Sequence, residues 1–203
     1  MSEETRASGG RPRSFDSDEV LDRALELFWK NGYAATTTRA LETELGLTQS
    51  SLYNAFGSKR ELLERTLVRY QEKVTSKLLV PLEDSPDGLS SLSRFFQSLA
   101  TWIASDGRRG CMLINLMAED GGKTDAVSAQ TRGYRARMRR GFRGALKRAK
   151  DAKEIADEDL GAKSELLVGL VLGLNIAARG GAAPAELRGI SRAAKTLIQG
   201  WKL

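Results

Sequence analysis

The sequence predicts an all-α protein of about nine helices, with a small N-terminal helical domain followed by a larger helical one. Apolar residues recur every three or four positions along most of the 203 residues, which is the spacing of helices with one buried face. Proline occurs only four times, and no alternating runs of valine, isoleucine or threonine indicate strands. This length and apolar content are sufficient for two hydrophobic cores.

The predicted organisation has three parts, namely residues 1–14, 15–60 and 61–203. The first part is polar, with glycine and arginine, and is expected to be a flexible basic arm. The second part begins with a helix near Ser17. Asp16 and Glu19 have the spacing of a capping box, in which each satisfies a backbone N–H at the start of the helix. The buried face of this helix is then Val20, Ala24, Leu27 and Phe28.

Residues 36–59 predict two short helices joined by a tight turn. Gly46 suits the left-handed backbone that ends a helix, and Thr48 suits the N-cap of the next helix. Leucines at 41 and 45, and Leu52 with Phe56, give each helix a buried face. Polar side chains that remain on the second helix form hydrogen bonds without filling a core, as a helix in the DNA major groove requires. They are Gln49, Ser50, Ser51, Tyr53 and Asn54.

Six further helices are predicted after this motif. Ser58 and Glu61 form a capping box that starts a long connecting helix over residues 59–79, and Pro81 and residues 85–88 are expected to end it. The remaining five helices are separated by glycine-rich breaks, and Pro184 marks the start of the last one. They are predicted at residues 89–103, 111–118, 125–150, 159–178 and 185–201.

Residues 11–75 resemble the TetR (tetracycline-repressor) family of bacterial transcriptional regulators. The resemblance rests on the helix at 17–28 with its Asn31-Gly32-Tyr33 exit, on the two helices of the turn motif, and on Ser58-Lys59. It implies a cytoplasmic, sequence-specific DNA-binding regulator, a repressor that binds a palindromic double-stranded DNA operator. It also implies that the larger domain binds a small-molecule effector and forms a homodimer. The alternative is a non-specific architectural DNA-binding protein, which would not need such a large apolar C-terminal half.

The resemblance also implies roles for individual residues in DNA binding. Arg39 matches a position that reaches a base edge, where the guanidinium suits guanine, and Gln49 suits adenine. Tyr53 and Lys59 match positions that hold the DNA backbone. The arginines of the arm either contact phosphates or a minor groove, or only solubilise the chain. The predicted DNA-binding residues are Arg39, Thr48, Gln49, Ser50, Ser51, Tyr53, Asn54 and Lys59.

The positive charge of the chain is not in the predicted DNA-binding domain. The net charge is +6, yet residues 1–60 hold eight basic and nine acidic residues. The basic excess lies in the helix at 125–150, from Arg132 to Lys150, and is expected to be a solvated helix surface. An effector domain that attracts anions and a non-specific DNA contact are the two alternatives.

Cys111 is the single cysteine of the sequence, and it follows Arg108-Arg109-Gly110 at the start of a short helix. Nearby cations and a helix N-terminus predict a lowered thiol pKa, and some TetR relatives with a similar segment sense electrophiles or oxidants there. The alternative is a small core residue. A lone thiol forms no intrachain disulfide, and with no signal-peptide pattern the sequence indicates a reducing cytoplasm.

The fifth to eighth helices are expected to enclose the effector. Large, adaptable apolar side chains with few polar groups suit an apolar or amphipathic ligand, although each of them also suits a plain core. The predicted ligand-binding residues are Phe95, Trp102, Cys111, Met112, Leu116, Tyr134, Met138, Phe142 and Asn175.

The last two helices are expected to form the homodimer interface. Gly169, Gly173 and Ala177 recur every four residues and give one helix a smooth face, and the last helix has an apolar stripe. The alternative is that these faces close the core of one monomer. Further predicted interface residues are Leu166, Leu170, Leu174, Leu187, Ile190, Ala194, Leu197 and Trp201.

An enzyme is not expected. The sequence has no histidine and one cysteine, which excludes Ser-His-Asp and Cys-His catalytic pairs and a histidine metal cluster. No glycine-rich phosphate-binding loop has P-loop or Rossmann spacing. We therefore expect no metal and no cofactor.

Overall fold

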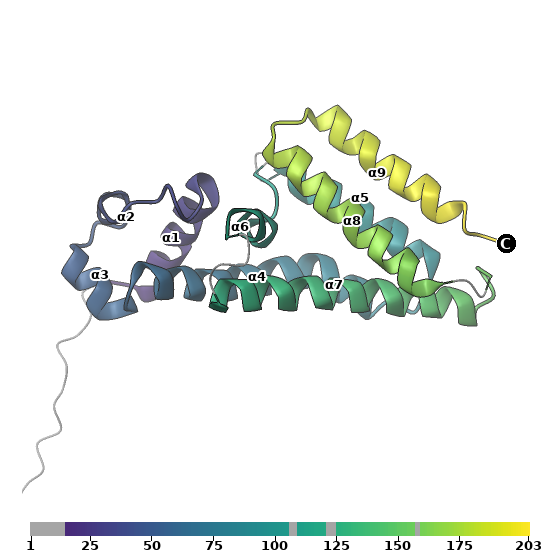
Figure 1. The fold of residues 1–203 in the computed structure, drawn as a ribbon, viewed down its shortest axis with the longest axis horizontal. Coiled ribbons are helices and arrows are strands. Elements are labelled where there is room, and N and C mark those ends of the chain that lie inside the picture. Colours follow the sequence, from purple (N-terminus) through teal and green to yellow (C-terminus); the bar gives the residue numbers. More distant parts are fainter. Residues whose placement is uncertain (1–14, 106–108, 121–124, 157–158) are drawn as a thin grey trace, which may run out of the picture.

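A computed structural model of the protein describes residues 15–105, 109–120, 125–156 and 159–203. In these ranges the chain forms nine helices and no strand, which confirms the all-α prediction (Figure 1). The arm predicted at residues 1–14, Arg108 and the Gly121-Gly122 break lie outside the described residues.

Three helices form the N-terminal domain, namely α1 (Ser17–Asn31), α2 (Thr38–Leu45) and α3 (Gln49–Phe56). Asp16 caps α1, and its carboxylate accepts from the backbone N–H of Asp18 at 2.8 Å. Gly46 ends α2 with a left-handed φ of 67°, and Thr48 caps α3. The expected apolar residues of α2 and α3 are buried, so this part of the sequence prediction is confirmed.

Helix α4 (Lys59–Glu83) runs from this domain into the larger one and continues further than predicted. Its N-terminal capping box of Ser58 and Glu61 is present. The expected end near residue 79 is wrong, because the helix passes through Pro81. The proline ring removes one backbone hydrogen bond of the helix, but Pro81 itself is exposed. The flanking Leu79 and Leu82 are buried in the core, and their packing stabilises the last turn.

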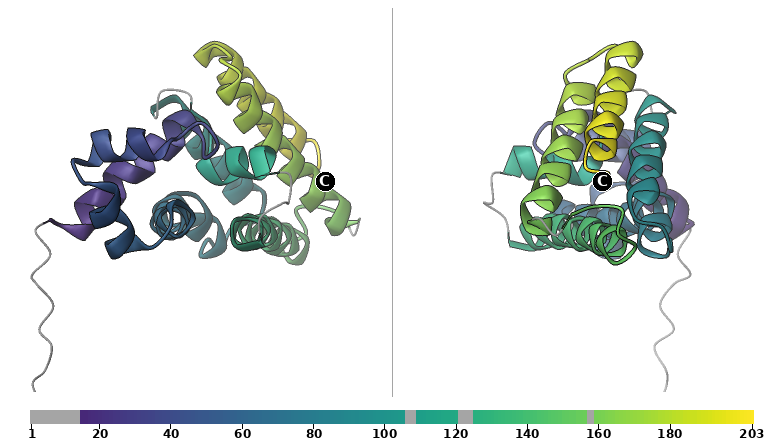
Figure 2. Two further views of the ribbon diagram at one scale, coloured as in Figure 1. Left: turned by 60° about the vertical axis from the view of Figure 1, so that its left-hand side comes forward. Right: turned by 90° about the vertical axis from the view of Figure 1, so that its right-hand side faces the viewer.

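The larger domain contains α5 (Leu89–Ser105), α6 (Met112–Asp120), α7 (Asp125–Asp151), α8 (Leu160–Arg179) and α9 (Pro184–Gln199). Figures 1 and 2 show α4 and α7 side by side, with α8 and α9 paired above them. Helix α5 approaches α7 closely at Gly88, where a Cβ atom would lie 2.4 Å from the Cα of Ala149. An aromatic cluster completes this core, with Phe142 packed against Phe95 and Phe96.

The basic helix α7 is more than the solvated surface expected from the sequence. Arg137 forms two hydrogen bonds with Glu83 at 2.9 and 2.6 Å, and Arg148 donates to the carbonyl oxygens of Leu82 and Asp87. These cations therefore lie at the C-terminal end of α4, where unpaired carbonyl groups attract positive charge. Arg139 pairs with Glu165 of α8. These arginines join helices, which the charge pattern alone did not indicate.

Helix α8 has one face in the core and one face exposed. Leu167, Val171 and Asn175 are buried, whereas Leu166 and Ile176 are 46% and 49% exposed. Among the described residues, α8 is the one helix whose length and apolar composition would allow it to cross a membrane, a property shared with core helices of soluble proteins. The two unlike faces, with Asn175 buried on one of them, are those of a helix packed against protein.

Candidate functional site

Helix α3 presents the polar side chains that the sequence singled out. Gln49, Ser50, Ser51 and Asn54 are exposed, and Leu52 on the opposite side is buried. The cap residue Thr48 is exposed too, and its hydroxyl donates to the Ser51 hydroxyl at 3.0 Å. The first turn of α3 therefore offers several hydrogen-bonding groups on a rigid helix, which is the arrangement that contacts base edges in a major groove.

Helix α2 supports α3 through polar contacts. The hydroxyl groups of Tyr53 and Thr38 are 2.9 Å apart, which positions the half-buried Tyr53 ring against the start of α2. The backbone N–H of Gln49 donates to the Glu42 carboxylate at 2.7 Å. Arg39 is exposed in the first turn of α2.

Lys59 lies at the first turn of α4 and is already engaged within the protein. Its ammonium group donates to the Tyr33 carbonyl oxygen at 2.8 Å and lies 4.3 Å from the centre of the Tyr33 ring. Partial burial lowers the pKa of Lys59 from its ordinary value. An ammonium group has three N–H donors, so two remain for a phosphate. Its predicted contact with the DNA backbone stays a prediction.

A set of contacts that the sequence did not indicate joins α1 directly to the larger domain. Trp29 donates its indole N–H to the Gly110 carbonyl oxygen at 2.9 Å, and its ring is stacked on Trp102. The Arg109 guanidinium lies 4.0 Å from the centre of the Trp29 ring and pairs with Glu26 at 2.6 Å. We call these residues, with Tyr33 and Glu119, the α1 contact. Adjacent aromatic residues at 28 and 29 were the available signal, since neighbouring residues on a helix point about 100° apart and therefore reach different partners.

Glu119 of α6 forms the other end of the α1 contact. Its carboxylate accepts from the backbone N–H of Tyr33 at 3.1 Å. The backbone here favours glycine at position 32, because Gly32 has a φ of 83°, which residues with a side chain rarely adopt. Tyr33 thus contacts Glu119 through its N–H and Lys59 through its carbonyl oxygen. This chain of contacts links the larger domain to a predicted DNA-binding residue.

The predicted ligand-binding residues are buried in the core. The backbone N–H of Cys111 donates to the Asn175 side chain at 2.7 Å, and the N–H of Met112 donates to the Tyr70 hydroxyl at 3.0 Å. Burial raises the pKa of the Cys111 thiol, and hydrogen bonds to neighbouring N–H and hydroxyl groups oppose this only in part. The expected lowering of the Cys111 pKa is wrong, because loss of water outweighs the helix N-terminus and the nearby cations.

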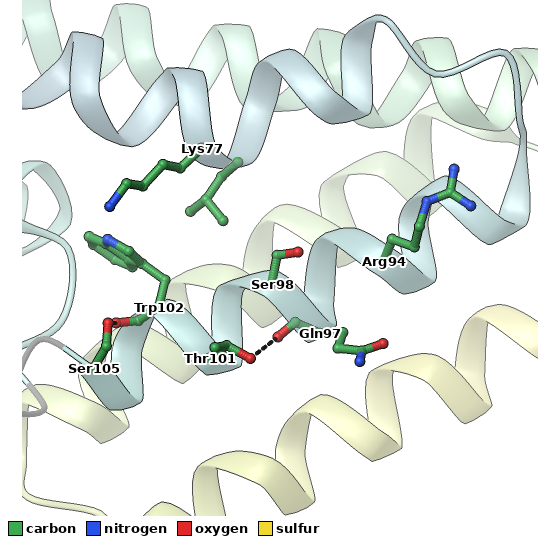
Figure 3. A pocket seen from close by; sticks show the side chains of 8 residues that line it. Lys77, Arg94, Gln97, Ser98, Thr101, Trp102 and Ser105 are labelled. Carbon is green, nitrogen blue, oxygen red and sulfur yellow. Dashed lines mark hydrogen bonds between the residues drawn. The ribbon is translucent and has the colours of Figure 1, made fainter.

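An open groove of about 570 Å³ lies between α4 and α5. Figure 3 shows Trp102 and Lys77 on the two sides of this groove, with Ser98 and then Arg94 further along α5. Of the nine predicted ligand-binding residues, Trp102 alone lines it. The others pack against one another, so an effector among them would have to separate buried side chains. The predicted effector site therefore stays a prediction.

The predicted dimer residues divide into three groups, of which the first is half-buried and consists of Leu170, Ala177, Ile190 and Trp201. Leu174, Leu187 and Ala194 are buried within the monomer, so assigning them to an intersubunit surface is wrong. Gly169 and Gly173 are exposed, and a Cβ at either position would have no atom within 4 Å. Together with the exposed Leu166, Ile176 and Leu197 they leave an apolar strip along α8 and α9, which we call the α8–α9 strip.

Both halves of the chain match known protein families. Residues 20–66 match the family described as bacterial regulatory proteins, tetR family, and residues 88–194 match the tetracyclin repressor-like C-terminal domain. The transcriptional repressor ComR of Escherichia coli K12 is 29% identical over 201 residues, covering 97% of this chain and 93% of ComR. The regulator CifR, solved as a cysteine mutant with 26-bp operator DNA, is 27% identical, with a TM-score of 0.79 over 92% of this chain and 98% of CifR. Reduced E. coli NemR, at 15% identity and a TM-score of 0.74, shares the fold over 92% of this chain and 96% of its own.

Proposed function

The chain belongs to the TetR family of bacterial regulatory proteins, and from this premise we propose that it represses transcription by binding a two-fold symmetric DNA operator as a homodimer. Members of this family are DNA-binding transcriptional regulators and not enzymes. The observation that carries the proposal is the exposed polar surface of α3, formed by Gln49, Ser50 and Asn54. The operator-bound state of the relative CifR supports it. We place this regulator in the cytoplasm.

We propose residues 15–60 as the DNA-binding domain and residues 61–203 as the effector-binding and dimerisation domain. Helix α4 starts at Lys59 and continues into the larger domain, so it carries any movement between the two. Helix α4 is the chief connection in this proposal, since it packs against α1 and α3 of the smaller domain. The α1 contact is a second connection, since α6 holds Tyr33 through Glu119 independently of α4.

Gln49→Ala and Lys59→Ala are expected to weaken operator binding in different ways. Gln49 lies in the first turn of α3 and is suited to a base edge, so its loss should cost about 1–3 kcal/mol at one base position and relax the preference there. Lys59 is suited to a phosphate, so its loss should weaken all operator variants alike. Binding isotherms on operators with each base pair changed in turn measure both effects.

Ser76→Ala is the control for these variants, because Ser76 is exposed on α4 and outside the predicted DNA-binding set. Its binding should match that of the wild type on every operator. If Gln49→Ala and Lys59→Ala gave the same pattern across operator variants, the division between base-contacting and phosphate-contacting residues would be wrong.

We propose that a reversible ligand, rather than modification of Cys111, releases the operator. The thiol is buried and its pKa is raised, whereas the groove between α4 and α5 is open and leads to Trp102. A ligand that separates Trp102 from Trp29 would disturb the α1 contact. It can weaken DNA binding only by its difference in affinity for the two states, typically about 1–3 kcal/mol.

Native Cys111 is expected to react with iodoacetamide many times more slowly at pH 7.5 than the same thiol in urea. The thiolate is the reacting form, and a raised pKa leaves less thiolate at this pH. The alkylation rate of the native protein should therefore keep rising as the pH is increased beyond the usual pKa of a thiol. Mass spectrometry of the alkylated protein follows both rates. Equal rates in the native and unfolded protein, or an electrophile that releases operator DNA from the wild type but not from Cys111→Ser, would favour the thiol mechanism instead.

A further inference from the structure

The outer face of α5 borders a groove that is rich in cations. Two adjoining cavities, of about 390 and 700 Å³, lie along α5 and α9 and share Gln97 and Lys195 in their linings. We call them together the α5–α9 groove. Figure 3 shows Gln97 and Thr101 on the side of α5 that faces α9, and both residues also border the groove at Trp102. The cations that line it are Arg94, Arg188, Arg192, Lys195 and Lys202.

Four of these cations have no acid to neutralise them. Arg94 pairs with Asp87 at 2.6 Å, whereas the other four form no ion pair with any residue that the structure describes. One carboxylate, that of Glu154, lines the groove, and it accepts the backbone N–H of Leu89 at 3.0 Å. Four free cations against one carboxylate leave an excess of three positive charges.

This excess is larger in the α5–α9 groove than in the groove at Trp102, where Lys77 and Arg94 are the cations, and it does not simply follow the charge of the whole chain. The groove on the other side of α4, toward α7, has a comparable volume of about 440 Å³ and is lined by one acid, Glu72, and one cation, Arg137. Arg137 already pairs with Glu83. The unneutralised cations are therefore concentrated in the α5–α9 groove, where one anion could contact several of them.

The α5–α9 groove also stays open in the proposed dimer. Arg188, Arg192 and Lys195 recur every three or four residues, so they share one face of α9. An α-helix turns by 100° per residue, so the face with these three cations is opposite to the face with Ala193 and the exposed Leu197 of the α8–α9 strip. The buried Leu187, Ala194 and Ile198 lie between the two faces. A partner subunit on the α8–α9 strip would therefore leave the groove accessible.

We propose that the α5–α9 groove binds a small compound with two or more phosphate groups. The Arg188 and Arg192 positions are one helical turn apart, about 6 Å along the axis, and each guanidinium can hold a phosphate through two hydrogen bonds. A phosphate group carries about −1.5 to −2 charges at neutral pH, so two groups match the excess charge. The small side chains of Ala100 and Ala104 line the groove beside these cations and leave room for the compound. The chemistry of this site differs from that of the predicted apolar effector site, because none of the nine predicted ligand-binding residues and no aromatic side chain lines it.

Titration calorimetry with tripolyphosphate tests the proposal on the full-length protein without DNA, at about 0.15 M salt. We expect saturable binding with one site per chain, and at least a tenfold loss of affinity in Arg188→Gln/Arg192→Gln. The matched control is Arg140→Gln/Arg143→Gln, which removes the same charge from the exposed surface of α7. The control should bind like the wild type.

Ala104→Glu is a second variant, which adds a carboxylate to the groove and keeps every cation. It should also weaken tripolyphosphate binding by about tenfold, the scale of one charge interaction in a partly desolvated site. Absence of saturable binding, or an equal loss in the α7 control, would overturn the proposal. Since DNA is absent from the titration, that failure would leave the proposed repressor function intact.

Discussion

Gly173→Arg is expected to convert the protein into monomers and to lower operator affinity by about 100-fold or more, because two linked half-site contacts become one. Within one chain a side chain at Gly173 meets no atom within 4 Å, so the monomer itself has room for arginine. Replacing a helix-interior glycine even favours the helix by up to about 1 kcal/mol. Sedimentation velocity at micromolar concentration measures the association state, and gel-shift titration measures the affinity.

Gly133→Arg is the matched control for this prediction. Gly133 is exposed on α7 and also has no atom within 4 Å of a built Cβ, but it lies outside the α8–α9 strip. This variant carries the same side chain and the same charge, and it should stay dimeric with wild-type operator affinity. A dimeric Gly173→Arg protein, or a Gly133→Arg protein that dissociates equally, would contradict the assignment of the interface.

Trp29→Ala is expected to lower the free energy of unfolding by about 3–5 kcal/mol, the usual cost of removing a large buried aromatic side chain. Trp29 packs against Tyr70 and Trp102, and Arg109 covers its ring. The variant therefore loses most of the α1 contact as well as core packing. Urea denaturation at a fixed protein concentration measures the effect, since dimerisation makes apparent stability depend on concentration.

Trp29→Phe separates packing from hydrogen bonding at the same position. The phenyl ring keeps much of the buried area, but the Gly110 carbonyl oxygen loses its donor, so the cost should be about 1–3 kcal/mol. If Trp29→Ala were as stable as the wild type, Trp29 would not join the two domains as we infer. Losses of equal size in both variants would assign the whole effect to the hydrogen bond.

The fold was largely predictable from local patterns. The α4 capping box, the left-handed Gly46 and the buried faces of α2 and α3 all depend on residues a few positions apart, and all were confirmed. The end of α4 was not predictable in this way, because burial of Leu79 and Leu82 outweighs the local effect of Pro81. Helix propensity is a weak guide wherever tertiary packing opposes it.

The site was predictable only where its residues are close in sequence. The polar face of α3 follows from helical spacing, and those residues are exposed as expected. The α1 contact joins residues about 80 positions apart, such as Trp29 and Gly110, so no local pattern could show it. The predicted direction of the Cys111 pKa shift was wrong for the same reason. The phenols of Tyr70 and Tyr134 and the carboxamide of Asn175 that surround it come from three other helices.

Hydroxyl-radical footprinting of the wild-type protein, on a fragment selected from random double-stranded DNA, tests the central claim most directly. A homodimer that places one α3 helix in each of two successive major grooves should protect two half-sites related by two-fold symmetry, with centres about 34–36 Å apart. The base sequence under the two protected regions should form an imperfect palindrome. A single protected region without two-fold symmetry, or protection that does not depend on sequence, would contradict the account.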